Sequence, residues 1–513
     1  MRPFIIKVAV KKPMTVVRIW LPEEYKDIPF EASVDGTEFK DYRGHFEHYF
    51  EEKGPHILQF RGDIPGLLIR DKKIHDDTIK RCTAGMPRDL PRKKEKPQKH
   101  ERGAYLYEYI FVNVMQWGDI PWKTMESMFS KCRYLTIQAK DAPDLSHVTS
   151  MREMFDRAKS FNSPIGHWDV SNICDMSGLF NEAECFNQSL ETWNIHHVKN
   201  MSYMFCGTKC FNQPLNKWNT SNVTNMNGMF DRAKAFNQPL NQWDTSQVTD
   251  MGYMFCDAES FNQPLNAWDT HNVTIMESMF SFAESFNQPI EQWDTSNVNN
   301  MRGMFNCAES FNQPLNRWDT HNVRNMFMMF QSAKSFNQPL DQWNTQNVKD
   351  MGHMFRETDA FNQPIETWDV HNVENMSFMF YKAKAFNQPL NRWDTRNVKE
   401  MSTMFEDAES FNQPLNQWNT GNVTNMIYMF KGAKTFNQPL NDWDTQNVRC
   451  MIGMFEGATS FDQPLDQWDM RSIEALEDVE NMFRDATSYR QPANKRPDLS
   501  GKPKERKSRY GLW

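Results

Sequence analysis

Histidine, aspartate and cysteine are the side chains of this 513-residue chain that could carry out chemistry, and many of them recur at multiples of 25 residues. Four histidines share one column of that repeat, as in a metal site built across several units: His196, His271, His321 and His371. Neighbours in this set are two or three repeats apart, roughly 10–15 Å in stacked coils, whereas one metal needs ligands at about 2 Å. We therefore expect surface histidines and no metal site.

An aspartate follows the tryptophan of most repeats, as Asp244 follows Trp243. A carboxylate that recurs in nearly every unit is more typical of a turn hydrogen bonder than of a catalytic acid. We find no nucleophile beside a base, no paired acids and no phosphate-binding glycine loop in the sequence. The sequence thus predicts a protein that is not an enzyme and that uses no cofactor.

The nine cysteines are an odd number and lack the dense spacing of a disulfide scaffold. Cys206 and Cys210 are followed by no second pair and by no suitably spaced histidines, which argues against a zinc site. We expect free thiols.

A 25-residue repeat must position all these side chains. Aligned on Met-x-x-Met-Phe, thirteen units follow in unbroken register, the first beginning at Met151 and the last at Met451. A degenerate unit begins at Met125 and another at Val479, as is typical of the capping units of a repeat array. One unit cannot bury its apolar face alone, so we expect the units to stack.

The apolar residues at the start of each unit have helical spacing. In one unit they lie at i, i+3, i+4, i+7 and i+10: Met226, Met229, Phe230, Ala233 and Phe236. Thr224 and Asn225 precede them and could cap a helix. A short helix is therefore expected in each unit.

A strand is expected later in each unit, near Leu240 to Trp243, because the preceding proline column is typical of a strand entry. The asparagine column that begins at Asn162 and ends with Asp462 is expected to form a ladder that binds backbone groups at the turn. The fold class predicted is an α/β repeat, a solenoid of helix-strand units preceded by a small mainly-β domain.

A threonine column could form a flat hydroxyl surface that orders water or contacts ice or sugar. Four apolar residues interrupt it, which favours an inward or half-buried position: Val170, Ile195, Val370 and Met470. A carbohydrate- or ice-binding array is therefore the least favoured alternative.

The repeat unit resembles that of BspA-type leucine-rich-repeat surface proteins, a resemblance that covers about Met125 to Pro492. The N-terminal region, with Val34-Asp35-Gly36-Thr37, is similar to the PKD-like β-sandwich that often precedes such repeats. The resemblance implies a leucine-rich-repeat-like solenoid used in attachment or protein binding at a cell surface, and it carries over no catalytic residue.

The sequence divides into five regions: a PKD-like domain at 1–85, a charged linker at 86–103, a lead-in at 104–124, the repeats at 125–492 and a basic, disordered tail at 493–513. The tail carries most of the eight Lys and Arg residues found from Arg490 onward, against two acids, Asp498 and Glu505.

The compartment stays open at this point. The first residues lack an ordinary secretory signal, so a cytoplasmic location stands beside the surface or secreted location that the resemblance implies. No window approaches 18 uninterrupted apolar residues, which predicts no membrane span. The net charge of −8 gives no electrostatic reason to bind nucleic acid.

Binding information should lie where the repeats differ and the side chain points outward. The residue before each tryptophan is such a position, and we call it the pre-Trp column. Its candidate partner-binding members are His167, Lys217, Gln242, Gln292, Arg317, Gln342, Arg392 and Gln417.

We expect the protein to be a module that binds or adheres to a macromolecule, most readily a protein of a host or neighbouring cell, with carbohydrate as a second partner class. The alternative is a structural spacer without a specific ligand.

Overall fold

The computed structural model describes residues 1–10, 15–69 and 111–504, which contacts divide into two compact units, Met1–Val223 and Thr224–Trp513. The only helical segments in these ranges are short 3₁₀ turns: η1 (Glu23–Tyr25), η4 (Leu476–Val479) and η5 (Ala493–Lys495). None of the helices in the described ranges is long and apolar enough to cross a membrane.

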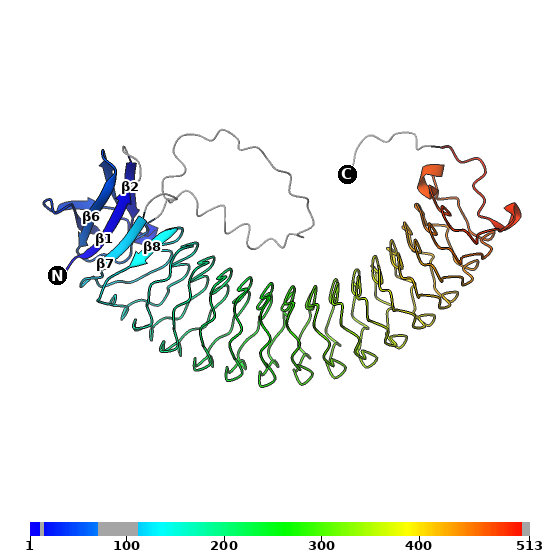
Figure 1. Ribbon diagram of the computed structural model, residues 1–513, viewed down its shortest axis with the longest axis horizontal. Helices are drawn as coiled ribbons and strands as arrows, with labels where there is room; N and C mark the ends of the chain where they lie inside the picture. Colours follow the sequence, from blue (N-terminus) through cyan, green and yellow to red (C-terminus); the bar gives the residue numbers. More distant parts are fainter. Residues whose placement is uncertain (11–14, 70–110, 505–513) are drawn as a thin grey trace. The chain divides into compact units, whose positions relative to one another are not determined.

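One eight-stranded sheet opens the first unit (Figure 1). Its spatial order is β2-β5-β4-β3-β6-β1-β7-β8, antiparallel except for the parallel pair β7 and β8. The strands are β1 (Phe4–Val10), β2 (Thr15–Trp20), β3 (Pro29–Val34), β4 (Lys40–Arg43), β5 (His45–Phe50), β6 (Gly54–Arg61), β7 (Phe111–Gln116) and β8 (Tyr134–Ile137). The sheet therefore joins the expected N-terminal domain to the lead-in and the first degenerate repeat.

Alternating burial places one face of β1, an interior strand of this sheet, against the core. Phe4, Ile6 and Val8 are fully buried, whereas the residues between them are partly or fully exposed, which is the period of a half-buried strand. The ring of Phe4 lies 5.4 Å from that of Trp117 and 5.3 Å from that of Trp122. The lead-in thus supplies two large side chains to the core of the sheet.

In the second unit each 25-residue repeat forms one coil, and successive coils lie side by side (Figure 1). The expected helix is wrong, and with it the α/β solenoid of helix-strand units. The backbone N–H groups of Met226, Gly228, Phe230 and Arg232 donate to carbonyls 24 residues further on, at 2.6–3.1 Å. These groups hydrogen-bond to the next coil rather than to the preceding turn of a helix.

Two residues with positive φ in each coil prevent a helix. Gly228 and Arg232 both have φ of 59°, and the same two columns have positive φ in other coils. Met229 N–H donates to the Met226 carbonyl and Ala233 N–H to the Phe230 carbonyl, so the segment is a series of β-turns. The turns still point the Met, Phe and Ala side chains inward, which is why helical spacing could not distinguish the two structures.

The expected strand at Leu240 to Trp243 is also wrong, because this segment turns, with the Trp243 N–H on the Leu240 carbonyl at 3.1 Å. Neighbouring coils pair instead through isolated parallel bridges at the residue before each first methionine, as Asn225 pairs with Asp250. The bridge residue Asp250 therefore lies seven residues after Trp243, outside the predicted strand.

The predicted asparagine ladder is confirmed. Asn237 Oδ1 accepts the backbone N–H of Asn262 at 3.0 Å and the amide of Gln263 at 2.9 Å, and this pair of bonds recurs in later coils. Asp462 continues the ladder by accepting from Arg490 N–H and from the Gln491 amide. One side-chain oxygen thus satisfies two donors of the next coil.

Threonine and tryptophan form two further ladders. Thr245 is 1% exposed and its hydroxyl donates to the Asp269 carbonyl at 2.8 Å, which confirms the inward position predicted for the threonine column. The indole N–H of Trp268 donates to the Leu240 carbonyl at 3.0 Å. Because these hydroxyls are buried, the threonine column cannot order surface water.

Stacked aromatic rings fill the interior of the coils. Phe230 and Phe255 lie 5.7 Å apart with an interplanar angle of 4°, and Phe230 also stacks on Phe236 of its own coil at 4.0 Å. Both methionines of each regular coil in the second unit are fully buried beside them. Neighbouring coils must therefore supply each other's core, as the inability of one unit to fold alone requires.

The last coil is covered by the residues that follow it. The inserted residues after Ile473 form η4, and the Leu476 N–H donates to the Pro503 carbonyl at 2.8 Å. The Leu465 N–H donates to the Lys495 carbonyl at 2.9 Å. Residues 493–504 of the expected basic tail therefore contact the array, and residues 505–513 lie outside the described range.

Replacement of Asn312 tests the asparagine ladder. Asn312→Ala removes the oxygen that accepts from the N–H of Asn337 and the amide of Gln338, both at 3.0 Å. We expect the free energy of unfolding, measured by urea denaturation, to fall by about 1–3 kcal/mol. Asn312→Asp, which keeps the oxygen as Asp462 does, should lose clearly less; equal losses would contradict the ladder.

Replacement of Ser278, whose φ is 53°, tests the coil against the helix. Glycine adopts positive φ freely, so Ser278→Gly should unfold at a higher urea concentration than Ser278→Ala, by about 1 kcal/mol in free energy. A helix would reverse the order, because alanine is the better helix former by about 1 kcal/mol. The ranking of the two variants, rather than either value alone, decides between the structures.

Candidate binding surfaces

The pre-Trp column lies at the turn between the leucine and tryptophan columns, not on a strand face. All eight residues predicted as the partner-binding surface are exposed. Those in the second unit follow one another along its coils, and His167 and Lys217 belong to the first unit. The position before tryptophan was therefore correctly predicted to point outward.

Glutamates of the preceding coil lie beside the cations of the pre-Trp column. Arg317 Nε lies 3.8 Å from Glu291, and Arg392 Nε lies 4.0 Å from Glu366. Both arginine side chains are 81% exposed, so the energy of these pairs is small. The acids nevertheless offset the positive charge of the arginines in this column.

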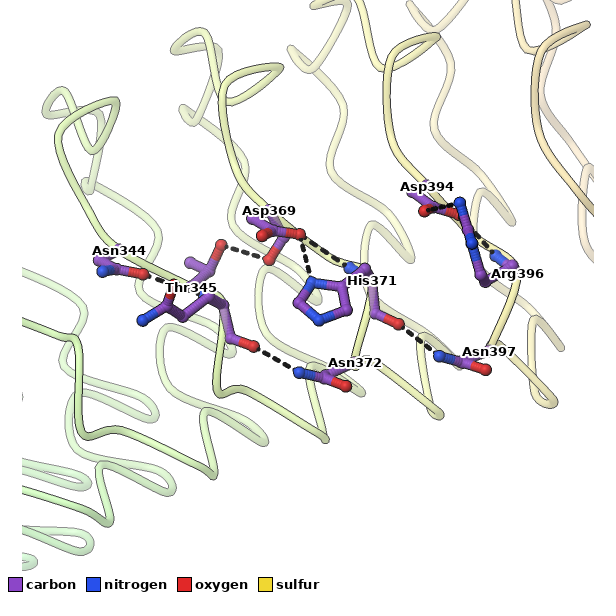
Figure 2. Close-up of polar contacts among 9 residues, drawn as sticks. Asn344, Thr345, Asp369, His371, Asn372, Asp394, Arg396 and Asn397 are labelled. Atoms are coloured by element: carbon purple, nitrogen blue, oxygen red, sulfur yellow. Dashed lines mark hydrogen bonds and ion pairs between the residues drawn. The ribbon is translucent and has the colours of Figure 1, made fainter.

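The histidine column lies on a polar edge (Figure 2). Asp369 Oδ1 accepts from the backbone N–H of His371 at 3.1 Å and lies 2.7 Å from its Nδ1. The amide of Asn397 donates to the His371 carbonyl at 2.7 Å. The aspartate after each tryptophan is thus a turn hydrogen bonder, as predicted, and the histidines occupy the surface.

The aspartate side chains of this edge hydrogen-bond within their own coil. Asp269 pairs with His271 at 2.8 Å as Asp369 does with His371, and the hydrogen bond from His271 lowers the pKa of Asp269. In the ranges that the structure describes, no group of three or more His, Cys, Asp or Glu residues could hold a metal ion.

A shallow polar depression of about 410 Å³ adjoins the edge, lined by Asn297, Asn299, Asn322 and Arg324. The amides of Asn297 and Asn322 already donate to carbonyls of the preceding coil. The depression contains no converging acids and no nucleophile, so it lacks the groups of an active site.

Sequence reasoning missed a second outward surface, on the outer side of the β-turn segment. Its side chains come from four successive coils of the second unit, and we call them the aromatic–cation cluster: Arg302, Phe327, His353, Arg356, Phe378 and Tyr381. All six are partly exposed.

Ring contacts connect the cluster from coil to coil. The Phe327 and His353 rings lie 5.0 Å apart, and the His353 and Phe378 rings stack at 4.5 Å. The Arg302 guanidinium lies 5.2 Å from the centre of the Phe327 ring, and that of Arg356 lies 5.1 Å from the Tyr381 ring. Aromatic and arginine side chains are the residues that most often dominate protein interfaces.

Other coils hold small or polar residues in the same columns. Ser377 and Ser402 occupy the column of Phe327, while Ser278, Gly303 and Thr403 occupy that of His353 and Phe378. The fold therefore does not require aromatic rings there. Comparing outward columns for residues that depart from the rest of the array would have found the cluster in the sequence.

The fold and these surfaces define a tandem-repeat protein of stacked 25-residue coils. A family model described as "Mycoplasma protein of unknown function, DUF285" matches residues 123–242, 211–315, 285–393, 308–417 and 388–496. These matches together cover more than half of the chain, which therefore belongs to this family. No curated protein matches the chain.

An ionic bridge across three coils of the first unit makes a pH prediction. The Glu184 carboxylate lies 2.6 Å from Lys159 Nζ and 2.8 Å from Lys209 Nζ, and hydrogen bonds from the two lysines lower the pKa of Glu184 to about 2. Because this folded-state pKa is depressed, ionised Glu184 stabilises the fold above its unfolded pKa near 4.5. That stabilisation is lost as the pH falls from 4.5 towards 2.

Thermal unfolding followed from pH 6 to pH 2.5 should therefore show a smaller acid-induced fall in midpoint for Glu184→Gln than for the unaltered chain. Glu474→Gln, which removes an exposed carboxylate with no ion pair in the described residues, is the control and should behave like the unaltered chain. An unchanged acid response in Glu184→Gln would rule out the bridge.

Proposed function

We propose that this protein is a non-enzymatic binding module that presents the outward columns of its coils to a macromolecular partner, most readily a protein. One contrast carries the proposal. Inward positions repeat almost unchanged, as with the fully buried Met and Phe columns, whereas outward positions change type from coil to coil. Repeat proteins recognise their partners through exposed positions that vary from repeat to repeat, while the backbone and the core stay the same.

The resemblance to BspA-type surface proteins supports the same proposal and suggests attachment at a cell surface, with a host or neighbouring-cell protein as partner. The family to which the chain belongs is one of unknown function, so it neither adds nor removes an activity. The buried threonine hydroxyls argue against the ice- or sugar-ordering alternative based on that column.

A spacer without a ligand is the alternative, and deletion of whole repeats distinguishes it. Removing residues 226–300 or residues 301–375 takes out the same number of coils and preserves the 25-residue register. A binding module should lose capture of a specific protein from host or neighbouring-cell extract with one deletion and keep it with the other. The measurement is quantitative mass spectrometry of proteins retained by each immobilised chain.

Equal retention by both deletion variants, or no specific retention by the full chain, would favour the spacer. The pre-Trp column is tested in the same assay by reversing the charge of Lys217, Arg317 and Arg392 together to glutamate. Unchanged capture by this triple variant would exclude the column as the partner surface, while leaving the other outward columns as candidates.

A further inference from the structure

We propose that the aromatic–cation cluster is the docking site for an acidic, extended polypeptide segment that carries apolar side chains. The inference rests on the proposed binding function and specifies the chemistry of the partner. The evidence is the charge of the cluster, the orientation of its rings and its length across the coils.

The charge of the cluster depends on its arginines. Some cations elsewhere pair closely with acids of neighbouring coils: Lys334 with Glu309 at 2.6 Å, and Lys434 with Glu409 at 2.9 Å. Arg302, in contrast, forms no ion pair with any residue in the described part of the chain. The positive charge of Arg302 is therefore not offset by a carboxylate of the described residues at ion-pair distance.

Arg356 of the cluster and the adjacent Lys382 add further positive charge. The Arg356 guanidinium has one acidic neighbour, Glu357, at 3.6 Å, and Lys382 Nζ lies over the Tyr381 ring at 4.8 Å. Three cations thus face outward around the rings, and Glu357 is the one carboxylate of the described residues within ion-pair distance of any of them, while Asp350 and Asp407 act on Arg302 and Lys382 from further away. Such a local positive surface attracts and orients a negatively charged partner.

The orientation of the rings excludes partners that stack. His353 lies between the Phe327 and Phe378 rings, and the guanidinium groups of Arg302 and Arg356 lie over the outermost rings. A sugar or a nucleobase needs an open ring face, whereas these faces are already covered. Only the ring edges remain accessible to a partner, and their partial positive charge attracts carboxylates.

The length of the cluster suits an extended peptide. It crosses three coil-to-coil steps, from Arg302 to Tyr381, or roughly 15 Å at about 4.8 Å per step. An extended chain advances about 3.3 Å per residue, so about five residues span the cluster. Alternate side chains of such a peptide could then contact the rings while acidic residues contact the cations.

The test uses the full chain and a fluorescein-labelled nonapeptide of glutamate with tryptophan at every second position, with binding followed by fluorescence anisotropy. Two double variants alter the cluster with residue types that other coils hold in the same columns: Phe327→Ser with Phe378→Thr, and Arg302→Glu with Arg356→Glu. Each should weaken binding about tenfold or more.

The control variant combines Ile427→Ser with Tyr428→Thr, which makes the same kind of change in the same two columns outside the cluster. It should bind the peptide as the unaltered chain does, and its urea unfolding midpoint should match that of the Phe327→Ser, Phe378→Thr variant. Equal loss of binding in control and cluster variants would overturn the proposal, as would the absence of saturable binding by the unaltered chain.

Competition separates an acidic peptide from other anions. Heparin and a single-stranded oligothymidylate, added at the same concentration of charge, should displace the peptide poorly. Efficient displacement by either would make the cluster a general polyanion site and overturn the proposal. If a protein captured from extract is retained equally by the cluster variants, this inference fails while the proposed binding function stands.

Discussion

The backbone hydrogen bonds from each coil to the next are the interaction on which the rest of this array depends. Alternate N–H groups at the start of a repeat donate to carbonyls 24 residues further on, as Met276 does to Asn300 and Ser278 to Arg302. N–H groups between them donate to carbonyls three residues earlier in the same coil, as Met279 does to Met276, and so form β-turns. Almost every backbone group of the segment is thereby satisfied without a helix or a continuous strand, which buried peptide groups require.

The fixed register between coils determines what each side chain can do. Because equivalent residues face each other from coil to coil, one asparagine oxygen can serve the next coil and one threonine hydroxyl can bind the next carbonyl. Positions tied into these ladders or into the aromatic core have little freedom to vary. Side chains at the outward positions of the β-turn segment belong neither to these ladders nor to the aromatic core. Aromatic and cationic residues can therefore occupy these positions, as in the aromatic–cation cluster, without disturbing the fold.

The sequence predicted the features that depend on one column at a time. The asparagine ladder, the inward threonines and the turn-forming aspartates follow from residue type and recurrence, and the structure confirms them.

The predicted helix was wrong because inward residues at i, i+3, i+4 and i+7 are compatible with both a helix and a series of β-turns. The missed signal was glycine: Gly178, Gly228, Gly303 and Gly453 share one column, which glycine marks as a position of positive φ. The aromatic–cation cluster could not be recognised from a single column, since its rings come from three columns after the first methionine and meet across coils.

The coil-to-coil bonding also sets how the array responds to mechanical tension. Each coil is bonded only to its two neighbours, so a pulling force applied along the stack loads every interface equally and the weakest interface breaks first. A detached coil releases 25 residues, which extend to roughly 80 Å at about 3.3 Å per residue. Tension would thus lengthen the chain in discrete steps while the remaining coils, and any partner bound to them, stay folded.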